Sequence, residues 1–236
     1  MTLVGAPSAP LPAVATPRSL AAAVLVPLAT IVVVLALAIL PLLTPLAMHP
    51  LLAQAQAAAW LGTSDAVAAQ LSDATVHDLV LGGEYAITLA DGQPLYGADE
   101  VGHLRDARTL LWLLLAGGAV SGAALAVRLA RGTDRPGTWR GIARGGVIAV
   151  VGTIVIGVVG FFAFEPLFEL FHRVFFPGGN WAFDPATSRL VRLYPYAFWE
   201  LAATALGLAT IVLGSLAWLV GRTLARRSVR PDAVTA

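Results

Sequence analysis

Four long runs of apolar residues dominate the chain, and the charged residues are confined to the segments between them. A helix needs about 20 mostly apolar residues to cross the hydrocarbon core of a bilayer. The pattern therefore predicts four transmembrane helices, at residues 20–47, 109–127, 145–164 and 201–221. Pro27 and Pro41 are expected to kink the first of them.

The composition supports this class of protein. Of the 236 residues, 58% are hydrophobic and 12% are charged, whereas a soluble domain carries roughly 25% charged residues. The sequence thus predicts an all-α membrane protein. It contains no cysteine, and its 15 lysine-plus-arginine residues are all arginine. Disulfides, thiolate chemistry and Schiff-base chemistry are therefore excluded.

Arginine is distributed unevenly between the connecting segments. Residues 1–19, 128–144 and 222–236 carry ten arginines and two acids, whereas residues 48–108 and 165–200 carry five arginines and twelve acids. Basic residues near span ends tend to remain in the cytoplasm. Both termini of this multi-pass protein of the cytoplasmic membrane are therefore predicted to be cytoplasmic, and all four histidines extracytoplasmic.

The first apolar run also has features of a signal peptide, with Arg18 before it and a small-residue stretch, AQAQA, at 53–57. Its length of about 28 residues exceeds that of a signal-peptide core. We interpret it as an uncleaved anchor. Cleavage would leave three spans with the same outer segments.

The first outer segment is expected to form a small subdomain of short helices. Residues 51–61 are rich in alanine and leucine, and residues 72–81 open with Ser72 and Asp73, which are good N-cap residues. Residues 84–97 alternate roughly around an Asp-Gly pair, which favours a short hairpin. Residues 98–111 predict a helix that continues into the second span without a break.

The second outer segment is rich in aromatic residues but is interrupted by turn-forming residues between 171 and 199. Such composition is typical of a re-entrant or surface-lying loop at the membrane interface. The alternative interpretation is the wall of a pocket for an amphiphilic substrate, with His172 at its mouth.

Two histidines are predicted at similar depth. His103 lies six residues before the second span, or roughly 9 Å above the hydrocarbon edge, and shares a helix face with Asp106. His172 lies eight residues beyond the third span, or roughly 12 Å above the same edge if that helix continues outward past Pro166. This is the depth of lipid ester bonds. Histidine suits proton transfer there, and Asp106 could hold the tautomer of His103.

The simpler interpretation of an interfacial histidine is a polar contact with lipid head groups, and His49 and His77 have weaker claims to function. No metal is expected, because the HLRD stretch lacks the i, i+4 histidine pair of a zinc helix. The four runs contain no ionisable residue, which argues against a transporter. The sequence has no GxSxG motif, no glycine-rich phosphate loop and no basic block for nucleic acid.

Two stretches together resemble the signature of a known family. HLRDAR at 103–108, which enters a span, is similar to a His-x-x-Asp-Val-Lys/Arg motif, with Ala107 where valine is common. FHRVFFPGGNWAFDP at 171–185, followed by L-x-x-L-Y-P-x-x-F-W at 190–199, resembles a second motif. In a four-span protein, they resemble the integral membrane family that includes lipoprotein intramolecular transacylase. The resemblance covers residues 20–221.

The resemblance implies acyl transfer on a lipidated protein. That enzyme moves the sn-2 acyl chain of a diacylglyceryl lipoprotein onto the amino group of its lipidated cysteine, and no cofactor or metal is expected. The implied partners are the lipidated lipoprotein and membrane lipid, with no nucleic acid. The implied catalytic residues are His103, His172 and Asp106, and the candidate substrate-binding residues are Arg173, Phe175, Phe176, Asn180 and Trp181.

A mechanism follows as a hypothesis. One histidine, His103 oriented by Asp106, takes a proton from the substrate amine, which attacks an ester carbonyl in the same molecule. His172 and nearby donors stabilise the oxyanion or protonate the glycerol oxygen. Two alternatives stay open: a non-enzymatic envelope protein that scaffolds or docks a partner, and a related enzyme that acts on free phospholipid.

Overall fold

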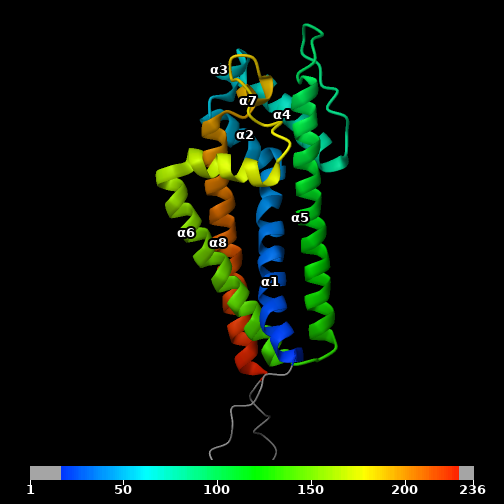
Figure 1. The fold of residues 1–236 in the computed structure, drawn as a ribbon, viewed down its shortest axis with the longest axis vertical. Coiled ribbons are helices and arrows are strands. Elements are labelled where there is room, and N and C mark those ends of the chain that lie inside the picture. The colour runs from blue at the N-terminus through cyan, green and yellow to red at the C-terminus, as the bar shows by residue number, and fades with distance from the viewer. Residues whose placement is uncertain (1–16, 229–236) are drawn as a thin grey trace, which may run out of the picture.

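The computed structural model describes the backbone of residues 17–228 and the side chains of residues 23–228. Residues 1–16 and 229–236, which belong to the two predicted cytoplasmic ends, lie outside the described residues. Four long helices stand side by side, and short helices gather at one end of them (Figure 1). All four are long and apolar enough to cross a membrane. The long helices are α1 (Pro17–Ile39), α5 (Ala98–Ala130), α6 (Arg135–Phe175) and α8 (Tyr196–Arg227). The short ones are η1 (Leu40–Leu43), α2 (Pro45–Gln54), α3 (Ala57–Leu61), α4 (Asp65–Leu81) and α7 (Arg189–Leu193).

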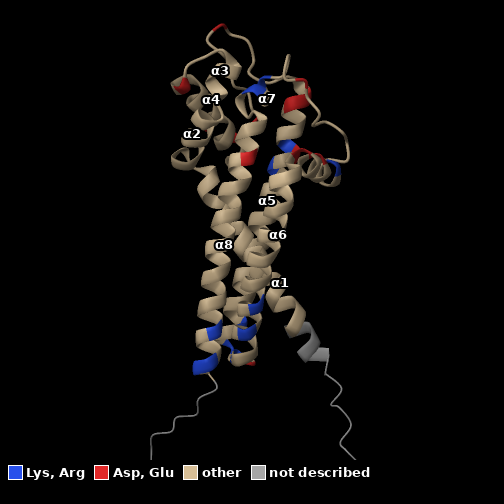
Figure 2. Ribbon diagram, turned by 90° about the vertical axis from the view of Figure 1, so that its left-hand side faces the viewer, with Lys and Arg blue, Asp and Glu red and all other residues tan. Residues whose placement is uncertain are grey.

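The chain is thus an all-α, four-span, multi-pass membrane protein. Arginine gathers at one end of the long helices, and most carboxylates lie at the other end, with the short helices (Figure 2). The predicted membrane boundaries stay predictions, since α5, α6 and α8 extend beyond the apolar runs they contain.

Glycine brings α6 and α8 into backbone contact. A Cβ at Gly146 would lie 2.4 Å from the carbonyl oxygen of Gly214, and one at Gly221 would lie 2.7 Å from the carbonyl oxygen of Trp139. Small residues at helix interfaces allow such approach in lipid, where van der Waals packing holds helices together. The same device joins α5 to α1, because a Cβ at Gly118 would lie 2.4 Å from the Cβ of Ala36.

The first apolar run is divided rather than continuous. α1 ends at Ile39, a 3₁₀ turn follows to Leu43, and Thr44 is extended before α2 begins. Pro41 and Pro45 explain the break, because neither can donate a backbone hydrogen bond to a continuing helix. The run that was predicted as one span therefore ends in α2, one of the short helices.

Three details of the short helices and the loop beside them differ from expectation. The helix expected over residues 51–61 breaks at Gln56, whose φ of 55° is left-handed. α4 begins earlier than predicted, because Ser64 caps it through the amide of Val67, and Ser72 is buried in the middle of the helix. The expected hairpin is a single bridge between Thr88 and Pro94.

The predicted helix over residues 98–111 is confirmed, because α5 runs unbroken from Ala98 into its apolar stretch. Its first turn is capped by Glu100, whose carboxylate accepts the amide hydrogen of Gly97 at 2.7 Å. His103 therefore lies on the same continuous helix, α5, that contains the second apolar run.

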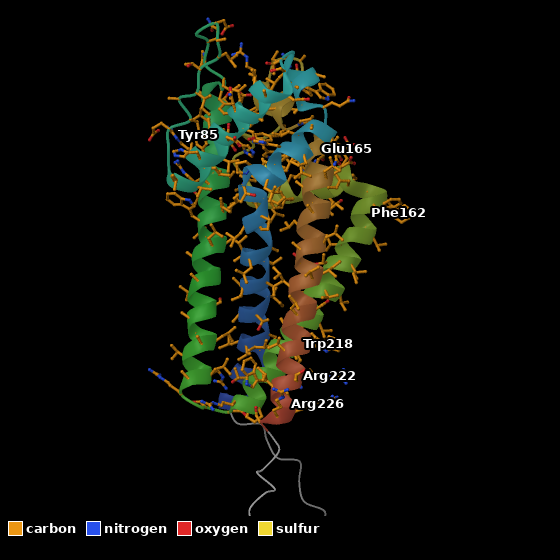
Figure 3. The ribbon with its side chains drawn as sticks, turned by 180° about the vertical axis from the view of Figure 1, so that it is seen from behind. Tyr85, Phe162, Glu165, Trp218, Arg222 and Arg226 are labelled. Atoms are coloured by element: carbon orange, nitrogen blue, oxygen red, sulfur yellow. The ribbon has the colours of Figure 1, made fainter. Side chains whose placement is uncertain are left out.

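α6 bends sharply at Ala163, where φ is −147° and ψ is 48°. Pro166 accounts for the bend, because it has no amide hydrogen and its ring clashes with the carbonyl four residues earlier, that of Phe162. Beyond the bend, the helix runs across the bundle rather than outward (Figure 1). Figure 3 shows Phe162 at the outer side of this bend. The expectation that His172 continues outward along the direction of the third span is therefore wrong.

Buried hydroxyl pairs tie the short helices together. Ser72 in α4 lies 3.1 Å from the hydroxyl of Tyr194, which follows α7, and Thr75 lies 2.7 Å from the hydroxyl of Tyr96, which precedes α5. Burial raises the pKa of Tyr194 to about 12, so its hydroxyl keeps its proton. These contacts fix the ends of α4, α5 and α7 relative to one another.

Candidate active site

The structure brings His103 and His172 together from two different helices. Their ring centroids lie 5.8 Å apart, and the rings are inclined by 27°. His103 is on α5 and His172 on the part of α6 beyond the bend, both outside the predicted spans 109–127 and 145–164. The expected pairing of two imidazoles thus occurs, although the bend in α6, not an outward extension, produces it.

Aromatic rings surround the pair. Phe176 lies 4.5 Å from the ring of His103 and 5.4 Å from that of His172, between centroids. Phe168 and Trp181 lie 4.1 and 5.0 Å from His172. The site is therefore poorly hydrated, which strengthens electrostatic interactions and disfavours charged imidazoles.

His172 is held in one tautomer. Its Nδ1 lies 2.8 Å from the carbonyl oxygen of Phe168, one turn earlier on the helix. A carbonyl only accepts hydrogen bonds, so Nδ1 carries the proton and the neutral ring has its lone pair at Nε2. Burial lowers the pKa of His172, and the bond to Phe168 acts in the opposite direction. The neutral ring is thus the form at neutral pH.

His103 is also neutral. Burial, followed by the nearby His172, lowers its pKa to about 4, against the opposing effect of the Asp106 carboxylate. Its Nδ1 is buried and has no hydrogen-bond partner among residues 17–228. A buried polar atom without a partner is costly and is often reserved for a ligand or water.

Asp106 binds a different partner from the one expected. Its Oδ2 accepts a hydrogen bond of 2.9 Å from the side-chain amide of Asn180, while within residues 17–228 it makes none to His103. The amide nitrogen of Asn180 makes this hydrogen bond. Its Oδ1 is buried and has no hydrogen-bond partner among the residues that the structure describes. Two unsatisfied polar atoms, one on His103 and one on Asn180, thus accompany the imidazole pair.

The other predicted substrate-binding residues divide into two groups. Phe176 and Trp181 contact the imidazoles, as described above. Arg173 instead pairs with Glu169 at 2.9 Å on the exposed side of the helix. Phe175 is half-exposed and packs on Phe171, with centroids 4.8 Å apart.

Sequence reasoning missed one residue that contacts the imidazole pair, Phe168, and one buried residue that supports the start of α5, Glu100. Phe168 precedes His172 by four residues, a spacing that could have indicated their contact. Glu100 is buried, and its Oε1 accepts from the hydroxyl of Ser188 and the amide of Leu190 at 2.5 and 2.9 Å. No local signal marks Glu100, because its partners lie 88 and 90 residues away.

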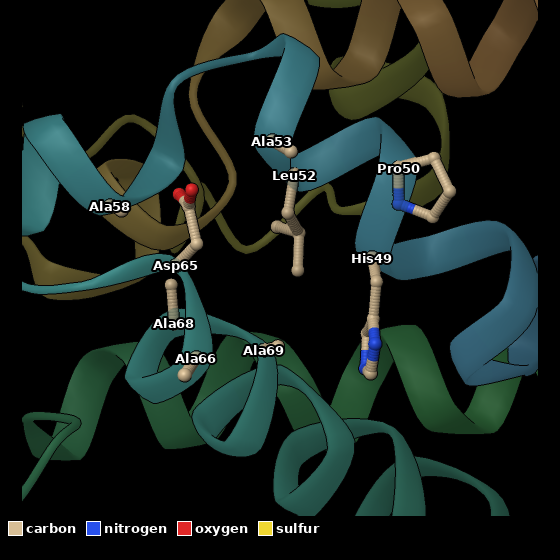
Figure 4. Close-up of a pocket in the computed structure, with 9 residues that line it drawn as sticks. All are labelled: His49, Pro50, Leu52, Ala53, Ala58, Asp65, Ala66, Ala68 and Ala69. Atoms are coloured by element: carbon tan, nitrogen blue, oxygen red, sulfur yellow. The ribbon is translucent and has the colours of Figure 1, made fainter.

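The other two histidines, His49 and His77, lie outside the imidazole pair and its aromatic rings. His49 pairs with Asp73 at 2.9 Å and lines a cavity of about 400 Å³ between α2, α3 and α4 (Figure 4). His77 is exposed beside Asp78. Within residues 17–228, no three His, Cys, Asp or Glu side chains gather as a metal-binding group.

The fold and the site define a class: a four-span membrane protein whose two neutral imidazoles stack among aromatic rings at one end of the helix bundle. A family model described as lipoprotein intramolecular transacylase Lit matches residues 74–199, which include both histidines. The chain belongs to this family, and membership supports an acyltransferase role. None of the curated proteins matches the chain.

Solved structures share the fold. The in meso structure of the membrane-integral lipoprotein intramolecular transacylase Lit from Bacillus cereus matches with a TM-score of 0.75 and 16% identity, over 89% of this chain and 97% of that chain. Two variants of that enzyme, in which a histidine is replaced by arginine or by alanine, match with TM-scores of 0.61 and 0.62. Both are also 16% identical over 89% of this chain, and 93% and 95% of their own chains are covered.

Proposed function

We propose that this protein is a lipoprotein intramolecular transacylase. It would move the sn-2 acyl chain of a diacylglyceryl lipoprotein to the amino group of the lipidated N-terminal cysteine. The observation that carries the proposal is the stacked pair of neutral imidazoles, His103 and His172, in a poorly hydrated site next to the predicted spans. A protein that only scaffolds a partner has no need for two adjacent uncharged histidines, one buried and one partly buried, among aromatic rings.

His172 is the better candidate for the base. Its Nδ1 proton is committed to the Phe168 carbonyl, so Nε2 is left to accept a proton from the substrate amine. The sequence had instead predicted His103 as the base, because Asp106 could orient its ring. That carboxylate is bonded to Asn180 instead.

The transfer balances without a cofactor. The amine nitrogen attacks the ester carbonyl as Nε2 of His172 takes its proton, and a neutral His103 offers its N–H to the oxyanion. The ester C–O bond then breaks, and the proton passes from His172 to the leaving glycerol oxygen. Amine and ester belong to one molecule, so proximity provides much of the rate.

Two groups would position the substrate. The unpartnered Oδ1 of Asn180 suits an N–H of the amine, because an amide oxygen only accepts hydrogen bonds. Phe176 and Trp181 offer apolar contact to the acyl chain beside the imidazoles. Arg173 and Phe175 would contribute at the edge of the site, where both are exposed.

The site would lie on the extracytoplasmic face of the cytoplasmic membrane. The end that carries the imidazoles also carries most carboxylates, whereas arginine dominates the opposite end (Figure 2). The positive-inside tendency then puts both termini in the cytoplasm. Diacylglyceryl lipoproteins would approach from the outer leaflet.

The test is co-expression with a reporter lipoprotein, followed by mass spectrometry of its N-terminal lipid. Wild-type protein should give the N-acylated lyso product. His103→Gln and His172→Gln should each reduce the conversion rate by at least about 100-fold, the usual contribution of acid–base groups. His77→Gln is the matched control, since His77 is exposed on α4, and it should convert fully.

Full conversion by both His103→Gln and His172→Gln would refute the proposal. A second arm offers the purified protein either a diacylglyceryl lipopeptide or phospholipid alone. Conversion of the lipopeptide is expected. Release of lysophospholipid without lipopeptide conversion would show an enzyme that acts on free phospholipid.

A further inference from the structure

The arginine-rich end of the bundle has a feature that the proposed transacylation does not use. A hollow of about 840 Å³ opens between α6 and α8, far along both helices from the imidazole pair. We call it the arginine pocket. The residues that define it are Arg140, Arg144, Trp218, Arg222, Arg226 and Arg227.

The arrangement follows from helix spacing and from one glycine. Arg140 and Arg144 are four residues apart on α6, and Arg222 and Arg226 are four residues apart on α8, so each pair shares a helix face. Gly221 lets the two backbones touch beside them, since a Cβ there would lie 2.7 Å from the amide nitrogen of Ala143. Two arginine-bearing faces thereby converge on one hollow.

Trp218 orders part of the pocket. The guanidinium of Arg222 lies over its indole ring, 5.4 Å from the centroid. Figure 3 shows Trp218, Arg222 and Arg226 in succession along the end of α8. A guanidinium that already packs on an aromatic ring loses less conformational entropy on binding a ligand than a mobile one does.

The arginines of the pocket have no ion-pair partner in the part of the chain that the structure describes. The carboxylate of Asp134, the acid of the loop before α6, instead accepts the amide hydrogen of Gly137 at 2.9 Å. Like charges four residues apart on a helix repel. The positive-inside tendency accounts for arginine at this end, but not for five arginines that line one hollow.

We propose that the arginine pocket binds the phosphate head group of an anionic glycerophospholipid, in the leaflet opposite the imidazole pair. Arginine forks bind phosphate oxygens two at a time. Basic pockets between transmembrane helices suit anionic head groups. The acyl chains have a surface beside the pocket, because Leu216, Leu219 and Val220 of α8 are exposed. A free phosphate would make no use of that apolar surface.

The experiment measures the thermal midpoint of the purified full chain in detergent with phosphatidylglycerol, phosphatidylcholine or inorganic phosphate. Phosphatidylglycerol should raise the midpoint by roughly 5 °C at saturation, and the other two should not. Arg144→Gln combined with Arg222→Gln should weaken the apparent affinity for phosphatidylglycerol by about tenfold or more.

Two single substitutions provide a second test, in which one changes the pocket and the other is a control outside it. Arg222→Gln removes one guanidinium from the pocket, and Arg131→Gln removes an exposed one at the same end but outside it. Native mass spectrometry should find less retained phosphatidylglycerol on the first and wild-type retention on the second. Equal loss in both, equal stabilisation by phosphatidylcholine, or equal stabilisation by inorganic phosphate would overturn the proposal.

Discussion

At the scale of single residues, the neutral state of His103 has a consequence for stability. Its pKa is lowered to about 4 by burial and by His172, whereas an unperturbed histidine titrates near 6.5. Between these values the unfolded chain binds the proton more readily than the folded one. Stability should therefore fall as pH drops from about 6.5 to about 4. The thermal midpoint across this range should decline less in His103→Gln than in wild type.

Isotope-labelled histidine offers a direct check by NMR. The His103 signal should still report a neutral ring at pH 5.5 and should change with a midpoint near 4. In Asp106→Asn the midpoint should move lower, because the carboxylate raises the pKa of His103. A His103 midpoint near 6.5 would contradict the buried, neutral imidazole.

The same scale shows what sequence reasoning reaches. The spacing of His103 and Asp106 predicts a shared helix face, and both residues do lie on α5. The spacing does not predict that Asp106 accepts a hydrogen bond from Asn180, 74 residues further along the chain. That contact depends on where the loop after α6 returns, and this is set by tertiary packing rather than by local pattern.

At the scale of elements, Glu100 joins the start of α5 to α7. Its buried carboxylate accepts hydrogen bonds from Gly97, Ser188 and Leu190. Glu100→Gln replaces one acceptor oxygen by a donor and leaves an amide hydrogen facing another donor. We expect a loss of about 1–3 kcal/mol in unfolding free energy. We also expect a lower rate of the proposed transacylation, because α7 directly follows the segment that carries Asn180 and Trp181.

Glu84→Gln is the control for that experiment. Glu84 forms an exposed ion pair with Arg105, and such pairs contribute roughly 0–1 kcal/mol. Chemical or thermal denaturation in detergent compares the two variants. A cost for Glu100→Gln no larger than that for Glu84→Gln would show that the carboxylate does not hold the elements together.

The bend in α6 is the element that the sequence located least well. Pro166 signals a disturbance, but a proline can kink, end or begin a helix, and nothing local gives the new direction. The bend falls at Ala163, and helix resumes up to Phe175. Only this change of direction carries His172 across the bundle to His103. The pairing of the two histidines could therefore be predicted, whereas the direction of the helix that brings His172 to His103 could not.

At the scale of the whole molecule, hydropathy was the reliable signal. Apolar runs of about 20 residues are dictated by bilayer thickness, so four spans follow from composition with little dependence on packing. The short outer helices were harder to predict. Their boundaries depend on caps such as Ser64 and on buried pairs such as Ser72 with Tyr194, which join distant segments.

The orientation of the whole molecule is the last prediction, and the absence of cysteine makes it simple to test. Ala90→Cys puts a thiol in the exposed loop among the short helices, and Thr133→Cys puts one in the exposed turn between α5 and α6. A membrane-impermeant maleimide should label the first in intact cells. It should label the second only after permeabilisation, since the excess of arginine predicts that this end is cytoplasmic. The opposite pattern would place the imidazole pair on the cytoplasmic face, where the proposed lipoprotein substrate would not meet it.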